Sequence, residues 1–462
     1  MNPSEAFSSH PRPDHRRRVV YFVWLPLVLG SLVVAGLVVH LYRSFRIETA
    51  EIARLRAAGE PVDDETAAHW YYAHTSQEGT AAWREVMVAV EQLAVWPTTA
   101  SFPIIGMHGE LPDDLVPGGD WPDEPQVAAL LNDLRPVIAQ IEQAAQYPAP
   151  VWQPMIGFES FNALLGDLPT VRRIASWLQL EFEHARYHRD TPRALRALEA
   201  MQAAIVAFDW NLCLADEWVT FAIRGILRRT IRESLANVDW EVEQLERLHE
   251  QLADPGDPAG RWQRVIAGER AMGLALFSAD PQFQHELTES RAPMAMFRWM
   301  GARRDYLETM AAVQQIGSAG VLGISDRARA FEEEKFGSQP VWISEMLTHL
   351  LMPSITAFAR AFERNELERR LTLTAVGIKR YEGAEGRWPT RLSDLRAVGL
   401  ESADWTALEA GPFGYRIEAG GPVLWSYDVL DYETPPEIPS EPPADDESDN
   451  NIVILGHVTR IR

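Results

Sequence analysis

The chain has 462 residues and a formal net charge of −23 at pH 7, from 66 acidic and 43 basic residues. So acidic a protein repels DNA, RNA and anionic lipid headgroups, which argues against a nucleic-acid partner. Hydrophobic residues make up 46% of the chain, enough for a large core, and the single cysteine, Cys213, excludes an intramolecular disulfide and a cysteine-based metal site.

An apolar run at the N-terminus begins at Val19, ends at Leu41 and contains no Asp, Glu, Lys or Arg. At roughly 1.5 Å per residue, a helix of this length spans about 34 Å, enough to cross a hydrocarbon core of about 30 Å. A cleaved signal peptide is the alternative interpretation, but signal peptides have only about 7 to 15 apolar residues and a small-residue cleavage site. We therefore predict a single-pass signal-anchor over residues 19–41, with membrane lipid as its partner.

The charges around this run predict its orientation. Residues 1–18 form a basic tail that includes Arg16, Arg17 and Arg18, whereas acidic residues accompany the arginines that follow the run. Short basic tails normally stay in the cytoplasm. We expect a helix in the inner (cytoplasmic) membrane and a body, from about residue 47 onward, in the periplasm of a Gram-negative cell.

Residues 47–350 are predicted to form a helical extracytoplasmic domain, a bundle or a short array. In one stretch, Leu195, Leu198 and Met201 recur every three residues and share a helical face. Short breaks such as 190–192 make successive helices pack as antiparallel neighbours. The predicted helices cover residues 48–58, 64–72, 80–96, 126–146, 171–187, 193–208, 214–235 and 238–252. Prolines and glycines recur in residues 97–125, which we expect to form a long loop or a linker.

Residues 354–462 are predicted to form a small α+β module. A long helix over 354–381 precedes β-like runs at 415–417, 423–427 and 451–455. Between the last two runs, residues 433–449 hold seven acids, five prolines and no basic residue, which predicts a solvated acidic loop. The fold class expected for the whole chain is therefore mainly α, with β structure only near the C-terminus.

Three sequence features of this C-terminal region follow one another. They are Glu-Gly-Arg-Trp-Pro at 385–389, Leu392 with Asp394 and Leu395, and Gly-Pro-Phe at 411–413. Together with the long helix, they resemble the soluble end of the pseudopilin-like modules of bacterial type II secretion. The resemblance implies a late loop that can hold calcium, and the corresponding oxygen ligands here are Asp445, Asp446, Asp449 and Asn450. Pseudopilins, however, place their membrane helix at the start of the long helix, which argues against assembly into a fibre.

Three other segments carry a second resemblance. They are Leu55–Pro61, Arg172–Ala175 and Gly268–Ala271. With these segments, the rest of the chain is similar to a family of uncharacterised, membrane-anchored bacterial proteins frequent in planctomycetes and some proteobacteria. The resemblance implies an architecture but no activity. In the last segment, Glu269 and Arg270 lie among apolar residues, which favours an ion pair that holds neighbouring helices together over a catalytic role.

One pattern of potential metal ligands occurs in the helical region. Glu181, His184 and His188 share a helical face at a spacing that can bind zinc or iron, and Glu246 with His249 offers a second Glu-x-x-His pair. Together they would resemble a di-metal carboxylate bundle. The alternative is a solvated helix face, because about one such match is expected by chance among 12 histidines and many glutamates.

The sequence contains no G-x-S-x-G elbow, H-E-x-x-H pair or phosphate-binding P-loop. We therefore predict a non-enzymatic, membrane-anchored scaffold or protein-binding protein of the envelope, with a protein partner and no cofactor. Two alternatives stay open. One is a metal-dependent enzyme that uses the Glu/His residues with zinc or iron, and the other is a calcium-stabilised accessory protein of a secretion system.

Overall fold

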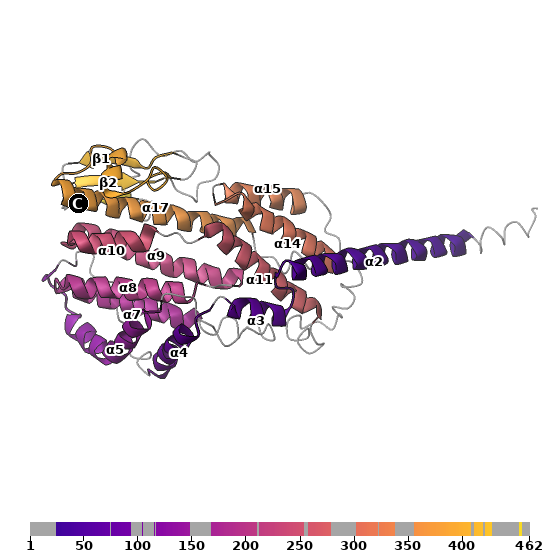
Figure 1. Ribbon diagram of the computed structural model, residues 1–462, viewed down its shortest axis with the longest axis horizontal. Coiled ribbons are helices and arrows are strands. Elements are labelled where there is room, and N and C mark those ends of the chain that lie inside the picture. The colour runs from indigo at the N-terminus through magenta and orange to yellow at the C-terminus, as the bar shows by residue number, and fades with distance from the viewer. Residues whose placement is uncertain are drawn as a thin grey trace, which may run out of the picture.

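The protein is mainly helical, with one small antiparallel sheet near the C-terminus, which confirms the predicted fold class (Figure 1). This computed structural model describes residues 25–73, 75–93, 104, 115, 117–147, 168–209, 212–253, 257–278, 302–321, 323–337, 355–407, 411–418, 421–426 and 452–454. The acidic loop predicted over 433–449 and the four potential calcium ligands, Asp445, Asp446, Asp449 and Asn450, lie outside these residues, as does most of the stretch 97–125.

Most helices begin and end within a few residues of the predicted ones. In chain order they are α2 (Leu25–Ala57), α3 (Asp64–Tyr72), α4 (Gln77–Gln92), α5 (Glu124–Ala144), α7 (Leu168–Tyr187), α8 (Thr191–Ala207), α9 (Leu214–Asn237), α10 (Val242–Ala253), α11 (Pro258–Ser278), α14 (Ala302–Ser318), α15 (Ile324–Phe336) and α17 (Ile355–Glu385). The main difference lies at the N-terminus, where two predicted helices are one. Residues 42–47 contain neither proline nor glycine, so nothing interrupts α2 between the apolar run and the body.

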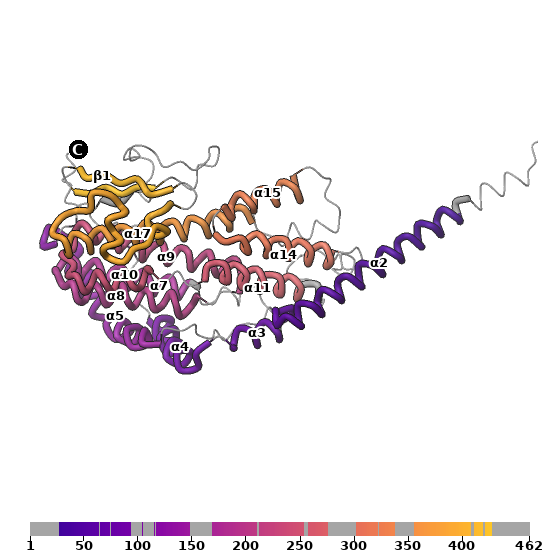
Figure 2. The backbone as a smooth tube through the Cα atoms, turned by 45° about the horizontal axis from the view of Figure 1, so that its top comes forward, coloured from indigo at the N-terminus to yellow at the C-terminus, as the bar shows by residue number. Residues whose placement is uncertain are grey.

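Helix α2 projects away from the body for much of its length (Figure 2). Its apolar side chains face outward, and Val33 is 70% exposed. Within the described part of the chain, it is the one helix long and apolar enough to cross a membrane. Its C-terminal part is fixed to α14, because Arg304 donates to Ser44 Oγ at 3.0 Å and Arg303 pairs with Glu48 at 3.0 Å. These contacts connect the exposed apolar part of α2 to the folded body.

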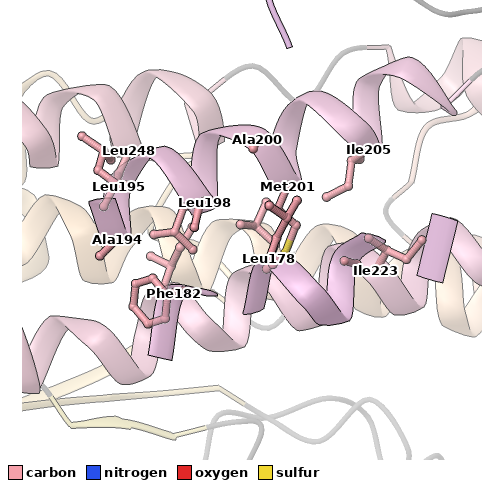
Figure 3. Packing of buried hydrophobic residues seen from close by; sticks show 14 of the residues in the cluster. Leu178, Phe182, Ala194, Leu195, Leu198, Ala200, Met201, Ile205, Ile223 and Leu248 are labelled. Carbon is pink, nitrogen blue, oxygen red and sulfur yellow. The ribbon is translucent and has the colours of Figure 1, made fainter. Parts of the chain in front are cut away.

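The larger core lies among α4, α5, α7, α8, α9, α10 and the C-terminal half of α17. Helices α7 and α8 pack as the antiparallel neighbours that the short break at 190–192 predicts. Figure 3 shows Leu178 and Phe182 of α7 beside Leu198 and Met201 of α8, and all four are buried. The three-residue recurrence of apolar side chains in α8 therefore marks its buried face.

A second core joins the end of α2 to α11, α14, α15 and the N-terminal half of α17. Trp262 lies at its centre, where its indole N–H donates to the Val313 carbonyl at 3.0 Å and its ring contacts Phe358 and Phe362. Helix α17 thus contributes to both cores. The two cores do not follow the predicted division between residues 47–350 and 354–462, because α17 packs along the body over its whole length.

The C-terminal sheet has the order β1 (Gly414–Glu418), β2 (Gly421–Trp425) and β3 (Ile452–Ile454), and all its pairs are antiparallel. Its strands fall at the three predicted β-like runs. In the central strand, Leu424 pairs with Tyr415 on one side and Val453 on the other. Leu424 is fully buried and belongs to the larger core, so the sheet packs onto α17 rather than forming a separate unit.

Candidate functional site

Two of the predicted metal ligands, His184 and His188, meet a third residue that the sequence pattern did not include. His184 lies in the last turn of α7, and His188 directly follows that helix, where its backbone N–H donates to the His184 carbonyl at 3.2 Å; Glu124 is the first residue of α5. Glu124 Oε1 lies 3.1 Å from His184 Nε2 and 3.0 Å from His188 Nε2. A metal ion could be held where at least three His, Cys, Asp or Glu side chains have ligand atoms within 4.8 Å of one another. Among the described residues, these three side chains meet that condition. We call them the Glu124 cluster.

The segment before α5 brings Glu124 to the histidines. Its Gly118 donates a backbone hydrogen bond to the carbonyl of Tyr187 at 3.1 Å, and the Tyr187 hydroxyl donates to the Gly119 carbonyl at 2.7 Å. Trp121, which is almost fully buried, packs edge-on against Tyr187. Because Glu124 begins a helix, its carboxylate is also stabilised by the positive end of the helix dipole.

Hydrogen bonds define the protonation pattern of the Glu124 cluster. Arg193 Nη1 lies 3.1 Å from His184 Nδ1, and a guanidinium can only donate, so His184 carries its proton on Nε2 and donates it to Glu124. Burial, reinforced by Arg193, lowers the pKa of His184 below its usual value. Hydrogen bonds from His188 and His184 lower the pKa of Glu124, so its carboxylate stays ionised.

The other predicted ligands have different partners. Glu181 is buried and accepts two hydrogen bonds from Arg193, at 2.5 and 2.6 Å, and one from Arg135 at 3.3 Å. On α10, Glu246 pairs with Arg380 of α17 at 2.9 Å. Burial, followed by the charge of Arg380, lowers the pKa of the nearby His249. The structure therefore brings together His184 and His188 but does not place Glu181, Glu246 or His249 in the Glu124 cluster.

Glu269 and Arg270 each connect α11 to other elements. Arg270 is 1% exposed and pairs with Glu60, just after α2, at 2.5 Å. Glu269 accepts the backbone N–H of Leu214 at 3.0 Å, at the start of α9. The expected ion pair that holds helices together is therefore present, but its acid is Glu60 rather than the adjacent glutamate. The segments 55–61 and 268–271 therefore meet at this contact.

A partly enclosed cavity of about 410 Å³ lies among α8, α9, α10, α11 and α17. Its charged side chains largely neutralise one another. Asp209 pairs with Arg224 and with Arg261, which lies 3.1 Å away, and Glu366 pairs with Arg369 at 2.8 Å. Burial alone would raise the pKa of Asp209, but the neighbouring arginines outweigh it and lower that pKa. These ion pairs join the segment after α8 to α9 and α11 and hold the charges of α17, which explains the polar lining of the cavity.

A larger hollow of about 560 Å³ opens between α9 and α17, which run side by side in the same direction. We call it the α9–α17 groove. Small residues recur along it, and the aromatic rings of Trp218 and Phe221 belong to its lining. Four arginines and one glutamate also line it: Arg229, Arg232, Arg360, Arg364 and Glu368. Four small residues line it as well: Ala222, Gly225, Ala357 and Ala361.

The arginines of the α9–α17 groove differ in how they are held. The side chain of Arg229 is 50% exposed and lies 3.9 Å from Glu233. Arg232 is buried and donates to Thr372 Oγ1 at 3.0 Å, and burial lowers its pKa. Arg364 donates to Glu368 at 3.0 Å. Because four arginines and only one glutamate line the groove, the net charge of its lining side chains is positive, although the chain as a whole is strongly acidic.

Sequence patterns alone did not reveal either arrangement. Glu124 lies 60 residues before His184, and its only local signal was its place at a helix start. The arginines of α9 and α17 recur at helical spacing, as they also do on ordinary solvated faces. The chain matches no protein-family model, no curated protein and no solved structure.

Proposed function

We propose that the protein is a membrane-anchored scaffold of the bacterial envelope whose α9–α17 groove binds an acidic, amphipathic helix of a partner protein. The observation that carries the proposal is the concentration of four arginines beside small and aromatic side chains in a chain of net charge −23. Electrostatic complementarity favours an acidic ligand at such a surface and speeds its association. The rest of the acidic surface would repel the same ligand.

The shape of the groove favours a helix over a small anion. On α9, its lining extends from Trp218 to Arg232, a rise of roughly 21 Å at about 1.5 Å per residue. Lining positions recur every three or four residues on both helices, and small side chains between them allow a third helix to approach closely. An amphipathic helix can place its apolar stripe against such a floor and its acids beside the arginines.

The anchor in this proposal is the apolar run from Val19 to Leu41. Its described part lies in α2, which exposes apolar side chains on all sides, as expected for a helix in lipid. The basic tail over residues 1–18 favours a cytoplasmic N-terminus, with the body outside the cytoplasm at the inner membrane. Removal of residues 1–46 should therefore transfer the protein from the membrane fraction to the soluble fraction, whereas recovery in the membrane fraction would contradict the anchor.

Binding to the groove can be tested with full-length protein in detergent and a fluorescent synthetic peptide. The peptide is an amphipathic helix with Leu on one face and Glu beside it, and its control carries Lys in place of every Glu. We expect saturable binding of the acidic peptide alone, measured by anisotropy. The affinity should weaken as salt is added, because the charges involved are partly exposed. Equal binding of the two peptides would refute the proposal.

Gly225 offers a matched pair of variants for the same assay. A Cβ at this position would meet only Glu368 Oε2, at 3.9 Å, so a side chain there extends into the groove without disturbing the core. Gly225→Leu should fill the floor and weaken peptide binding roughly tenfold or more, whereas Gly225→Ala should bind like the unmodified protein. Unchanged binding by the leucine variant would place the peptide elsewhere on the molecule.

A further inference from the structure

We propose that Glu124, His184 and His188 form a binding site for a divalent transition-metal ion of the zinc class. This site is separate from the α9–α17 groove, and its argument does not depend on the proposed scaffold role. Two imidazole nitrogens and one carboxylate oxygen converge at the junction of α5 and α7. Three protein ligands with an open fourth position are typical of zinc sites that also bind water or a further ligand.

The spacing of the ligand atoms fits a single ion. Glu124 Oε1 lies 3.1 Å from His184 Nε2 and 3.0 Å from His188 Nε2. Ligand atoms at about 2.0 to 2.2 Å from a tetrahedral ion lie roughly 3.3 to 3.6 Å from one another. The two Glu124–histidine distances are close to this value, and all three ligand atoms lie within 4.8 Å of one another. The i, i+4 spacing of the histidines places both imidazoles on one helix face, as in other helical zinc sites.

The surroundings provide access and selectivity. The His188 side chain is 46% exposed and that of Glu124 23%, so an ion can enter from solvent, whereas His184 is largely buried. Imidazole ligands favour Zn²⁺, Co²⁺ and similar ions over Ca²⁺ and Mg²⁺, which prefer oxygen ligands. The ring of Trp121 lies 6.3 Å from that of His184 and can report binding by its fluorescence.

Arg193 controls how strongly the site binds. A histidine that binds metal through Nε2 normally donates its Nδ1 proton to an acceptor, but here Nδ1 faces the guanidinium of Arg193 at 3.1 Å. Binding through Nε2 therefore requires the imidazole proton to be on Nδ1 instead of Nε2, and the contact between Arg193 and Nδ1 must open. Arg193 can keep its two hydrogen bonds to Glu181 when this happens. Its replacement by glutamine, whose amide oxygen can accept the Nδ1 proton, should tighten metal binding.

The test uses metal-free, full-length protein in detergent, titrated with Co²⁺ and then with Zn²⁺ as competitor. We expect one equivalent of Co²⁺ to bind, with a visible absorption spectrum and quenching of tryptophan fluorescence. His188→Asn and Glu124→Gln should each weaken binding roughly tenfold or more, and Arg193→Gln should strengthen it. His69→Asn is the matched control, because His69 is an exposed histidine on α3.

Four outcomes would overturn the proposal. They are no saturable Co²⁺ binding, unchanged binding by His188→Asn, an equal loss in His69→Asn, and weaker binding after Arg193→Gln in a variant with the normal helical circular dichroism. Gly225→Leu should bind Co²⁺ like the unmodified protein, because its side chain enters the α9–α17 groove. The metal site and the peptide groove can therefore fail independently of one another.

Discussion

The buried carboxyl of Glu269 should make the stability of the protein depend on pH. Burial, together with the charge of Asp216, raises its pKa from an ordinary 4.5 to about 7. The folded protein therefore keeps a proton on this group that the unfolded chain releases at lower pH. Linkage then requires the free energy of unfolding to fall as pH rises from about 4.5 to 7. A pKa difference of this size corresponds to roughly 3 kcal/mol.

Glu269→Gln removes this dependence while preserving the local hydrogen bond. The amide oxygen of glutamine can accept the Leu214 N–H that Glu269 accepts at 3.0 Å. The variant should match the unmodified protein near pH 4 and exceed its free energy of unfolding by roughly 3 kcal/mol at pH 8. Urea unfolding of the full-length protein in detergent, followed by far-ultraviolet circular dichroism at several pH values, measures the difference.

A control for this experiment is Glu243→Gln, because Glu243 is an exposed carboxylate at the start of α10. The control should leave the pH profile unchanged. If the difference in unfolding free energy between Glu269→Gln and the unmodified protein is the same at pH 5 and pH 8, the pKa of Glu269 is not raised by burial and the reasoning fails.

Two further predictions each compare a pair of variants. Glu60→Ala should cost about 3 to 5 kcal/mol of stability because it leaves Arg270, 1% exposed, without its carboxylate. Arg270→Met should cost less, because the side chain of Glu60 is 26% exposed and can be hydrated; equal costs in urea unfolding would contradict this. Gly268→Ala should destabilise the protein by about 1 to 3 kcal/mol, because its Cβ would lie 2.0 Å from the Leu212 carbonyl oxygen. Gly225→Ala should stabilise α9 by about 0.5 to 1 kcal/mol, and thermal unfolding that ranks these two alanine variants the other way would refute the prediction.

Local patterns in the sequence were sufficient to predict most of the described helices, although no bounds were predicted for α11, α14 and α15. Leu195, Leu198 and Met201 recur at helical spacing because they share the buried face of α8. One prediction was wrong: a break was expected between the apolar run and the helix over 48–58, but α2 is continuous through this region. Charged residues begin there, but a change of polarity does not interrupt backbone hydrogen bonding, so α2 continues through it.

The candidate sites could be predicted only in part. The spacing of His184 and His188 placed them together because the last turn of α7 continues to His188 through a backbone hydrogen bond, and helical geometry is a local property. Glu124 joined them only through the packing of α5 against α7, over a separation of 60 residues. Glu181 has the right spacing for a ligand, but Arg193 and Arg135 bind its carboxylate instead.

By itself, the sequence determined that the protein is helical, strongly acidic and equipped with an apolar N-terminal run, because these properties depend on composition and on residues close together in the chain. Only the tertiary structure decided that Arg270 pairs with Glu60 and that α9 and α17 together form a cationic groove. Such contacts depend on which helix faces meet. Many helices in this chain have similar amphipathic faces, so their pairing is set by the packing of the whole core.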